Sequence, residues 1–168
     1  MVVNDEIRQG KVILRSGDVF QSDLKRGRKG YFQFLYQDDS FLSGHLIRAF
    51  SFTRRTYSSL EEIVNGPVAF FGFTFLFEGL KERYWTRIGS IPVERTFEPP
   101  MFKTTDDTKY YVQKSYDWHI WKGNFADAIR IGEMTDEYRD LPDSVLVTPE
   151  TLVEWLEAGR QITDYLPD

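Results

Sequence analysis

The histidines His45 and His119 are the side chains of this 168-residue chain best suited to acid–base chemistry near neutral pH. A catalytic histidine needs a nucleophile or an orienting carboxylate, and the nearest candidate along the chain is Asp117, two residues before His119. On a strand, that spacing puts both side chains on one face, where a hydrogen bond can form without any chemistry. The two histidines lack metal-ligand spacing, and the chain has no cysteine. The sequence therefore predicts no catalytic site, no metal site and no cofactor.

Adjacent acidic residues occur in three places, at Asp38-Asp39, Glu61-Glu62 and Asp106-Asp107. Acid–base catalysis would need two carboxylates across a cleft, in environments that separate their pKa values. Adjacent residues on a strand point to opposite faces, and acids in a loop are usually solvated. Glu61-Glu62 fits the first turn of a helix. The two aspartate pairs lie in polar turns, so we expect them to form an exposed negative surface that attracts a basic partner.

A basic tract, Lys25–Lys29, precedes the aromatic stretch Tyr31–Phe34. A positive loop beside aromatic side chains can bind phosphates and stack bases. The tract has neither the spacing of a phosphate-binding loop nor the glycine fingerprint of a dinucleotide site. A charged hairpin tip explains it better in a chain whose net charge is −5.

Trp118 and Trp121 flank His119 and Ile120. The pattern favours core positions for these two large rings, and anchors at a protein interface are the alternative. Together with Asp38, Asp39, Asp106 and Asp107, they are the residues that the sequence offers for contact with a partner.

The elements that must position these residues are organised around the apolar run Val68–Phe77. Both of its faces are apolar at a period of two, which predicts a central strand buried on both sides, with a bulge or bend at Gly72. The run is shorter than the about 20 residues that a membrane-spanning helix needs. One face should hold Phe71, Phe73, Phe75 and Phe77. On that face, truncating Phe73 or Phe75 to alanine should cost about 3–5 kcal/mol.

The remaining pattern predicts short strands and turns with two or three helices. A short helix over Ser59–Gly66 begins with a capping box and ends at glycine, and a C-terminal helix over Thr148–Gly159 has a threonine cap and a first-turn proline. We expect Tyr84–Ile88 to return antiparallel beside the Val68–Phe77 strand through a turn, and another strand at Tyr110–Val112. Phe125–Ile131 fits either a helical turn or a strand.

Length and composition indicate one α+β domain over residues 1–168, with a mostly antiparallel, strongly curved sheet or partial barrel. The absence of cysteine suits a reducing cytoplasm, and the N-terminal residues show no secretory pattern. A pI near 5.1 argues against binding to nucleic acid or to an anionic membrane. An acidic protein is better matched to a basic protein partner.

The order of several short motifs resembles that of a known family. Gly17-Asp18-Val19-Phe20 is followed by an aromatic strand, by Ser59–Ile63 before Gly66-Pro67, by Trp85–Val93 and by Pro99–Lys103. Over roughly Lys11–Lys103, this series resembles the immunity protein 26 family of bacterial polymorphic-toxin systems. The resemblance implies a protein that binds and neutralises a toxin delivered by neighbouring cells, and it supplies no catalytic residues.

Several functions are therefore open at this stage. The leading one is a cytoplasmic, non-enzymatic inhibitor that masks a cognate toxin by non-covalent binding, and its acidity would complement a basic nuclease. One alternative is a small RNA-cleaving or RNA-binding barrel, which the net charge of −5 disfavours. Another is a structural module that binds a peptide along an exposed sheet edge.

Overall fold

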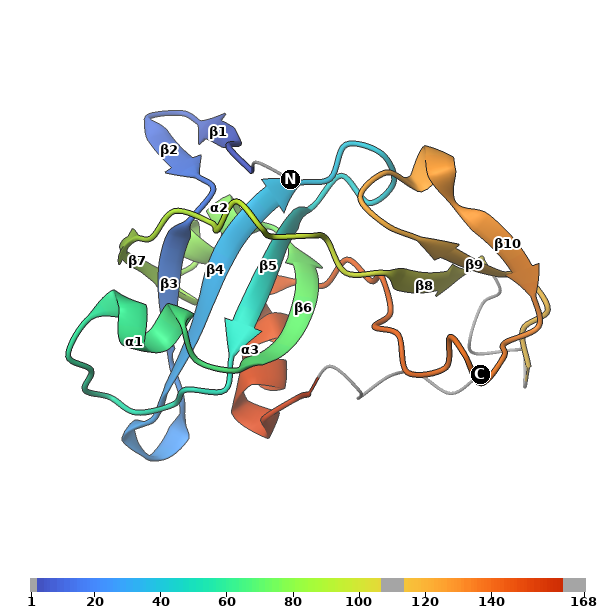
Figure 1. Cartoon of the computed structure of the whole chain (residues 1–168). Coiled ribbons are helices and arrows are strands. Elements are labelled where there is room, and N and C mark those ends of the chain that lie inside the picture. The colour runs from blue at the N-terminus through green and yellow to red at the C-terminus, as the bar shows by residue number, and fades with distance from the viewer. Residues whose placement is uncertain (1–2, 107–113, 162–168) are drawn as a thin grey trace.

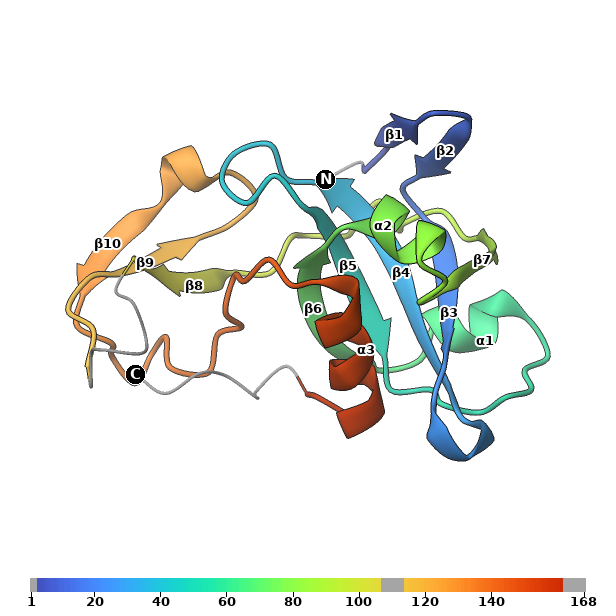
Figure 2. The same ribbon diagram turned by 180° about the vertical axis from the view of Figure 1, so that it is seen from behind.

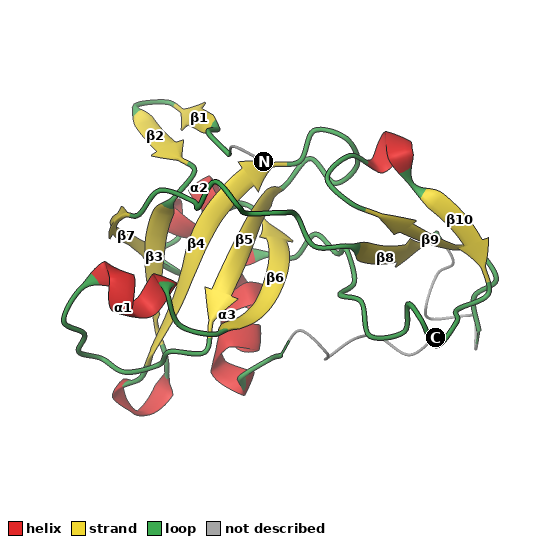
Figure 3. Ribbon diagram, viewed as in Figure 1, coloured by secondary structure: helices red, strands yellow, loops and turns green. Residues whose placement is uncertain are grey.

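The computed structural model of the protein describes residues 3–106 and 114–161, and its fold is α+β (Figure 1 and Figure 3). Within these ranges ten strands form open antiparallel sheets, accompanied by three α-helices. The fold class and the antiparallel pairing are confirmed, and the sheets do not close into a barrel. The strand predicted at Tyr110–Val112 lies outside the described residues. No described helix is long and apolar enough to cross a membrane.

The elements have the following bounds. The strands are β1 (Glu6–Gln9), β2 (Val12–Arg15), β3 (Asp18–Asp23), β4 (Lys29–Gln37), β5 (His45–Phe50), β6 (Val68–Thr74), β7 (Thr86–Ser90), β8 (Phe102–Thr105), β9 (Trp118–Trp121) and β10 (Ile129–Gly132). The helices are α1 (Leu60–Val64), α2 (Leu76–Lys81) and α3 (Pro149–Ala158), with 3-10 turns η1 (Lys25–Gly27) and η2 (Phe125–Asp127). The segment whose structure the sequence left open is therefore a 3-10 turn followed by a strand.

The main sheet has five strands in the order β6-β5-β4-β3-β7, and all of its pairs are antiparallel. A second sheet, β10-β9-β8, lies beside the β6 edge in Figure 1, and the β1–β2 hairpin stands apart from both. β3 and β4 form the hairpin that the sequence predicted, with the basic tract at its tip. Strand β4 is the central strand, and every residue from Gly30 to Tyr36 is buried.

Different elements cover the two faces of the main sheet. Helices α2 and α3 lie over one face, as Figure 2 shows. The core on this face combines sheet residues with helix residues, including Phe20, Phe32, Phe34, Ile47, Phe70, Leu76, Trp85, Leu152 and Leu156. Two further clusters involve residues of the main sheet. In one, Tyr31 and Phe50 pack with Ile63 of α1. In the other, Leu46 and Phe73 pack with Phe102 of the second sheet.

The prediction that Val68–Phe77 is a central strand is wrong. Strand β6 ends at Thr74 and occupies an edge of the main sheet. Its two-sided burial comes from the layers above and below, because Phe70 contacts Trp155 of α3 and Phe73 contacts the second sheet. The bulge or bend predicted at Gly72 is not found, because Gly72 pairs with Ile47 in register. The irregularity in the pairing of β5 with β6 falls between Ala49 and Phe50.

The predicted phenylalanine face breaks at the end of β6. Phe71 and Phe73 pack in one cluster, but the chain then turns into α2, with Phe75 at its N-cap. Phe75 is 37% exposed, whereas Phe73 is fully buried. A shared buried face is therefore wrong for Phe75. Helix α2 also replaces the turn predicted before Tyr84–Ile88, and β7 pairs with β3 rather than with β6.

The two helices predicted from their caps are both present, but only one is capped as predicted. In α3 the Thr148 hydroxyl accepts a first-turn N–H, Pro149 occupies the first turn, and Gly159 ends the helix with a left-handed φ of 68°. In α1 the Ser59 side chain makes no capping bond. The Glu62 carboxylate instead accepts from the Ser58 backbone N–H at 2.7 Å.

Candidate functional site

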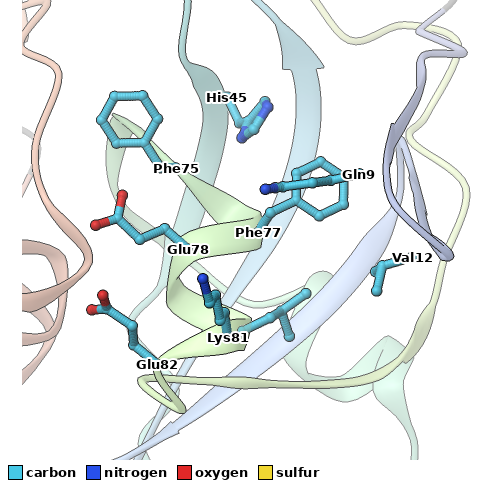
Figure 4. A pocket seen from close by; sticks show the side chains of 9 residues that line it. Gln9, Val12, His45, Phe75, Phe77, Glu78, Lys81 and Glu82 are labelled. Carbon is cyan, nitrogen blue, oxygen red and sulfur yellow. The ribbon is translucent and has the colours of Figure 1, made fainter.

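An open groove of about 790 Å³ lies between the β1–β2 hairpin and α2 (Figure 4). Its walls are Gln9 and Val12 of the hairpin, His45 of β5, and Phe75, Phe77, Glu78, Leu80, Lys81 and Glu82 in and around α2. Two of these apolar residues are unusually accessible, since Val12 is 47% exposed and Phe75 is 37% exposed. The groove therefore presents apolar surface to the outside of the molecule.

The start of α2 is fixed by residues that are distant in sequence. Strand β6 ends where the Thr74 hydroxyl donates to the Val147 carbonyl at 2.9 Å. The N–H of Leu76, at the first position of the helix, donates to Nδ1 of His45 at 3.0 Å. Because both neighbours of Phe75 are held in this way, its ring is kept at the groove without burial.

His45 acts here as a helix cap. Its Nδ1 accepts a hydrogen bond, which requires the neutral ring, and its ring makes edge contacts with Phe34 and Phe77. Burial lowers the pKa of His45 to about 4, against a smaller raising effect from the Asp39 carboxylate. The imidazole is therefore uncharged at neutral pH and bonded to the backbone, a structural role for which it needs no nucleophile.

This burial should make stability depend on pH through His45. The unfolded histidine has a pKa near 6.5, so between about pH 6.5 and 4 the unfolded state binds a proton that the folded state does not. Lowering the pH from 7 to 5 should then remove about 1–2 kcal/mol of stability through this residue. The variant His45→Asn keeps an acceptor near Nδ1 but does not titrate, so urea unfolding at the two pH values should show a smaller loss for the variant. Equal losses would contradict this account.

Four exposed carboxylates gather where α2 meets α3. They belong to Glu78 of α2, to Glu82 at the C-cap of that helix, and to Glu150 and Glu154 of α3. A spacing of four residues puts each pair on one side of its helix. Both pairs lie near the hydroxyl of Tyr84. Desolvation raises the pKa of this hydroxyl most, and the negative charges of all four carboxylates raise it further. Within the described residues, none of the four forms an ion pair.

The aspartates predicted from the sequence have different environments. Asp38 is only 2% exposed, and its carboxylate accepts hydrogen bonds from Ser40, Phe41 and Leu42, so the expected exposure is wrong for this residue. Its charge holds the loop before β5. Asp39 and Asp106 are exposed, and Asp39 accepts a bond from the Gln37 side chain. Asp107 lies outside the described residues.

The two predicted tryptophan anchors are buried in the second sheet. Trp118 is 1% exposed and Trp121 is 2% exposed, which matches the core alternative that the sequence favoured. Between them, His119 Nδ1 lies 3.1 Å from the backbone oxygen of Asp117, while the Asp117 carboxylate binds Arg130. The structure therefore does not pair the side chains of His119 and Asp117. Across the described ranges, no three histidine, cysteine or acidic side chains are placed to hold a metal ion.

Two of the four basic side chains in the tract at the β3–β4 tip form ion pairs within the protein. Arg28 forms an ion pair with Glu157 of α3, and Lys29 forms one with Asp23. The aromatic residues that follow have no exposed face for a nucleic-acid base, since Tyr31, Phe32 and Phe34 are fully buried. The arrangement is that of a charged hairpin tip, and at this hairpin Tyr31, Phe32 and Phe34 offer no stacking surface for RNA.

Sequence reasoning missed the groove and its acidic rim, which consists of Glu78 and Glu82 together with Glu150 and Glu154 of the neighbouring α3. The spacing of Glu78 with Glu82, and of Glu150 with Glu154, was a visible signal once both segments were helical. The segment from Leu76 to Lys81 was predicted as strand and turn, so Glu78 was not placed on a helix with Glu82 at its end. Nothing in the sequence alone brings α2 beside α3.

Comparison with known proteins gives one match. The model of a family described as Immunity protein 26 matches residues 15–112. This region contains the main sheet and α2, while the groove residues Gln9 and Val12 and the whole of α3 lie outside it. No curated protein and no solved structure matches the chain.

Proposed function

The chain belongs to the immunity protein 26 family, and from this premise we propose that it binds a cognate toxin and neutralises it by non-covalent masking. Such an inhibitor acts by covering the working surface of the toxin in the cytoplasm of the cell that it protects. It needs an exposed and well-held binding surface, and it needs no reactive group of its own.

The observation that carries this proposal is the groove beside α2. Accessible apolar residues lie there beside carboxylates that form no ion pair with any described residue, and hydrogen bonds to distant residues fix the start of α2. Interfaces commonly combine an apolar or aromatic centre with a polar rim. A surface with both features supports binding to another protein.

The charge of the protein supports a basic toxin. The net charge is −5, and the acidic rim concentrates negative charge on one side of the molecule. A nuclease must attract the negative phosphates of nucleic acid, so it commonly carries a positive surface. We therefore include a basic nuclease as the preferred class of toxin within this proposal.

A titration tests the proposal. Capture of the toxin from the source cells with the tagged protein supplies the reagent, and increasing amounts of purified protein are then added to a toxin activity assay. Because masking is stoichiometric, inhibition should reach its end point near one protomer per toxin molecule. Complete protection at a small fraction of that ratio would instead indicate an enzyme. Failure to capture or inhibit any toxin would refute the proposed function.

A further inference from the structure

We propose that the toxin docks on one defined face of this protein with a lysine- or arginine-rich segment that also carries an apolar side chain. We call this surface the acidic groove face, and it consists of Val12, Phe75, Glu78, Glu82, Glu150 and Glu154. The apolar side chain of the toxin occupies the groove beside Phe75, and its basic side chains meet the carboxylates. This inference rests on the proposed function and adds to it the contact surface and the chemistry of the partner.

Phe75 has the properties of an aromatic anchor. The residue is 37% exposed and lines a groove of about 790 Å³. On one side the Thr74 hydroxyl donates to the Val147 carbonyl, and on the other the Leu76 backbone N–H donates to His45. Little backbone freedom is then lost when a partner covers the ring, and aromatic residues held in this way often dominate binding energy. Val12 adds apolar surface from the opposite wall.

The carboxylates around Tyr84 lack the ion-pair partners that several other acids of the fold have. Glu157 binds Arg28, Asp117 binds Arg130, and Glu94 binds Arg48 through both of its oxygens. By contrast, Glu78, Glu82, Glu150 and Glu154 form no ion pair with any described residue. Like charges that are close together and unpaired repel one another, so a cationic partner relieves this repulsion when it binds.

The composition of the groove limits what the partner can be. Figure 4 shows Glu78, Glu82 and Phe75 on one side of α2, and Val12 on the β1–β2 hairpin at the other side of this helix. Lys81 also lines the groove, and it offsets only part of the negative charge. An acidic or phosphate-rich partner would meet the carboxylates of Glu78 and Glu82 in the groove and those of Glu150 and Glu154 near Tyr84. A purely polar partner would make no apolar contact with Phe75. A basic segment with an apolar side chain satisfies both features.

A peptide probe tests the location without the toxin. Labelled peptides of alternating lysine and leucine, and matched peptides of glutamate and leucine, are titrated into the isotopically labelled protein, and backbone amide shifts are recorded by NMR. The lysine peptide should perturb residues 75–82 and 150–154 most, and the glutamate peptide should not. Perturbations centred on other acidic surfaces would overturn the inference, as would an unchanged pattern in the quadruple variant E78Q/E82Q/E150Q/E154Q.

Rate measurements with the captured toxin test the same surface in function. In low salt the quadruple variant should associate at least about tenfold more slowly than the wild type, and the difference should shrink near 1 M salt, where the screening length is roughly 3 Å. The charge-matched control D39N/D106N/D127N/E137Q neutralises four other exposed acids, including two that the sequence predicted as contacts. This control should change the rate less than about threefold.

A second pair of variants separates the anchor from the charges. Phe75→Ala should raise the toxin dissociation rate at least about tenfold. Ile129→Ala, which truncates a residue that is 66% exposed on β10, should change it less than about twofold. If the wild type binds toxin tightly but the groove variants behave like their controls, this inference fails and the proposed function stands. If the wild type binds no toxin, the proposed function fails, and the peptide titration still decides whether the face binds basic segments.

Discussion

Replacing Phe73 by alanine is expected to destabilise the protein by about 3–5 kcal/mol, a large part of the about 5–15 kcal/mol that holds a typical domain together. The ring is fully buried where the main sheet meets the second sheet. Its centroid lies 5.1 Å from that of Phe102 and 6.0 Å from that of Trp121. Truncation removes these contacts and leaves a cavity that a packed interior cannot close fully.

Phe75→Ala is the matched control, because it makes the same chemical change two residues further along the chain. Phe75 is 37% exposed, so its loss should cost less than about 1 kcal/mol of stability. Urea unfolding of the two variants at neutral pH measures both values. A loss for Phe73→Ala as small as that for Phe75→Ala would mean that the junction between the sheets is not packed as described.

Elements that are defined by neighbouring residues were predictable from the sequence. The β3–β4 hairpin follows from two apolar segments joined by a glycine-containing basic tract, and the structure pairs Val19–Asp23 with Lys29–Gln33. Helix α3 follows from Thr148, Pro149 and Gly159, which define its ends within the segment itself. In these cases the information needed to form the element lies within a few residues.

Helix α2 was missed because its capping group comes from another strand. The run of apolar residues through Leu76 and Phe77 resembles a continued strand, and no Ser, Thr, Asp or Asn occupies the N-cap position. The acceptor for the first helical N–H is His45, 31 residues away. Burial on both sides of β6 was misleading for a similar reason, since it comes from α3 and the second sheet rather than from a central position.

The candidate site was predictable only in its chemistry. An acidic surface for a basic partner follows from the net charge, but the turn at Asp38 uses its carboxylate to hold a loop, and Trp118 and Trp121 fill a core. Acids four residues apart share one surface only when the chain between them is helical, and the two pairs come together only where α2 and α3 meet.

Gly79 gives the most sensitive test of how α2 is positioned. Alanine normally stabilises a helix by about 1 kcal/mol relative to glycine. At this position a Cβ would overlap the indole ring of Trp85, which is 2% exposed and packs edge-on against Phe32. The ring also donates from Nε1 to the Leu76 carbonyl at 3.2 Å, so it cannot move aside without breaking that bond.

Gly79→Ala should therefore destabilise the protein by about 2 kcal/mol or more, because overpacking outweighs the gain in helix propensity. Gly72→Ala is the control, since the nearest atoms to a new Cβ there lie 3.6–3.8 Å away, at ordinary contact distance. Its effect should stay within about 1 kcal/mol of the wild type. Denaturant unfolding measures both, and a neutral or stabilising Gly79→Ala would show that α2 does not pack against Trp85 in this way. If α2 shifts to relieve the overlap, Phe75 and Glu78 move with it, so toxin binding should weaken in Gly79→Ala and persist in Gly72→Ala.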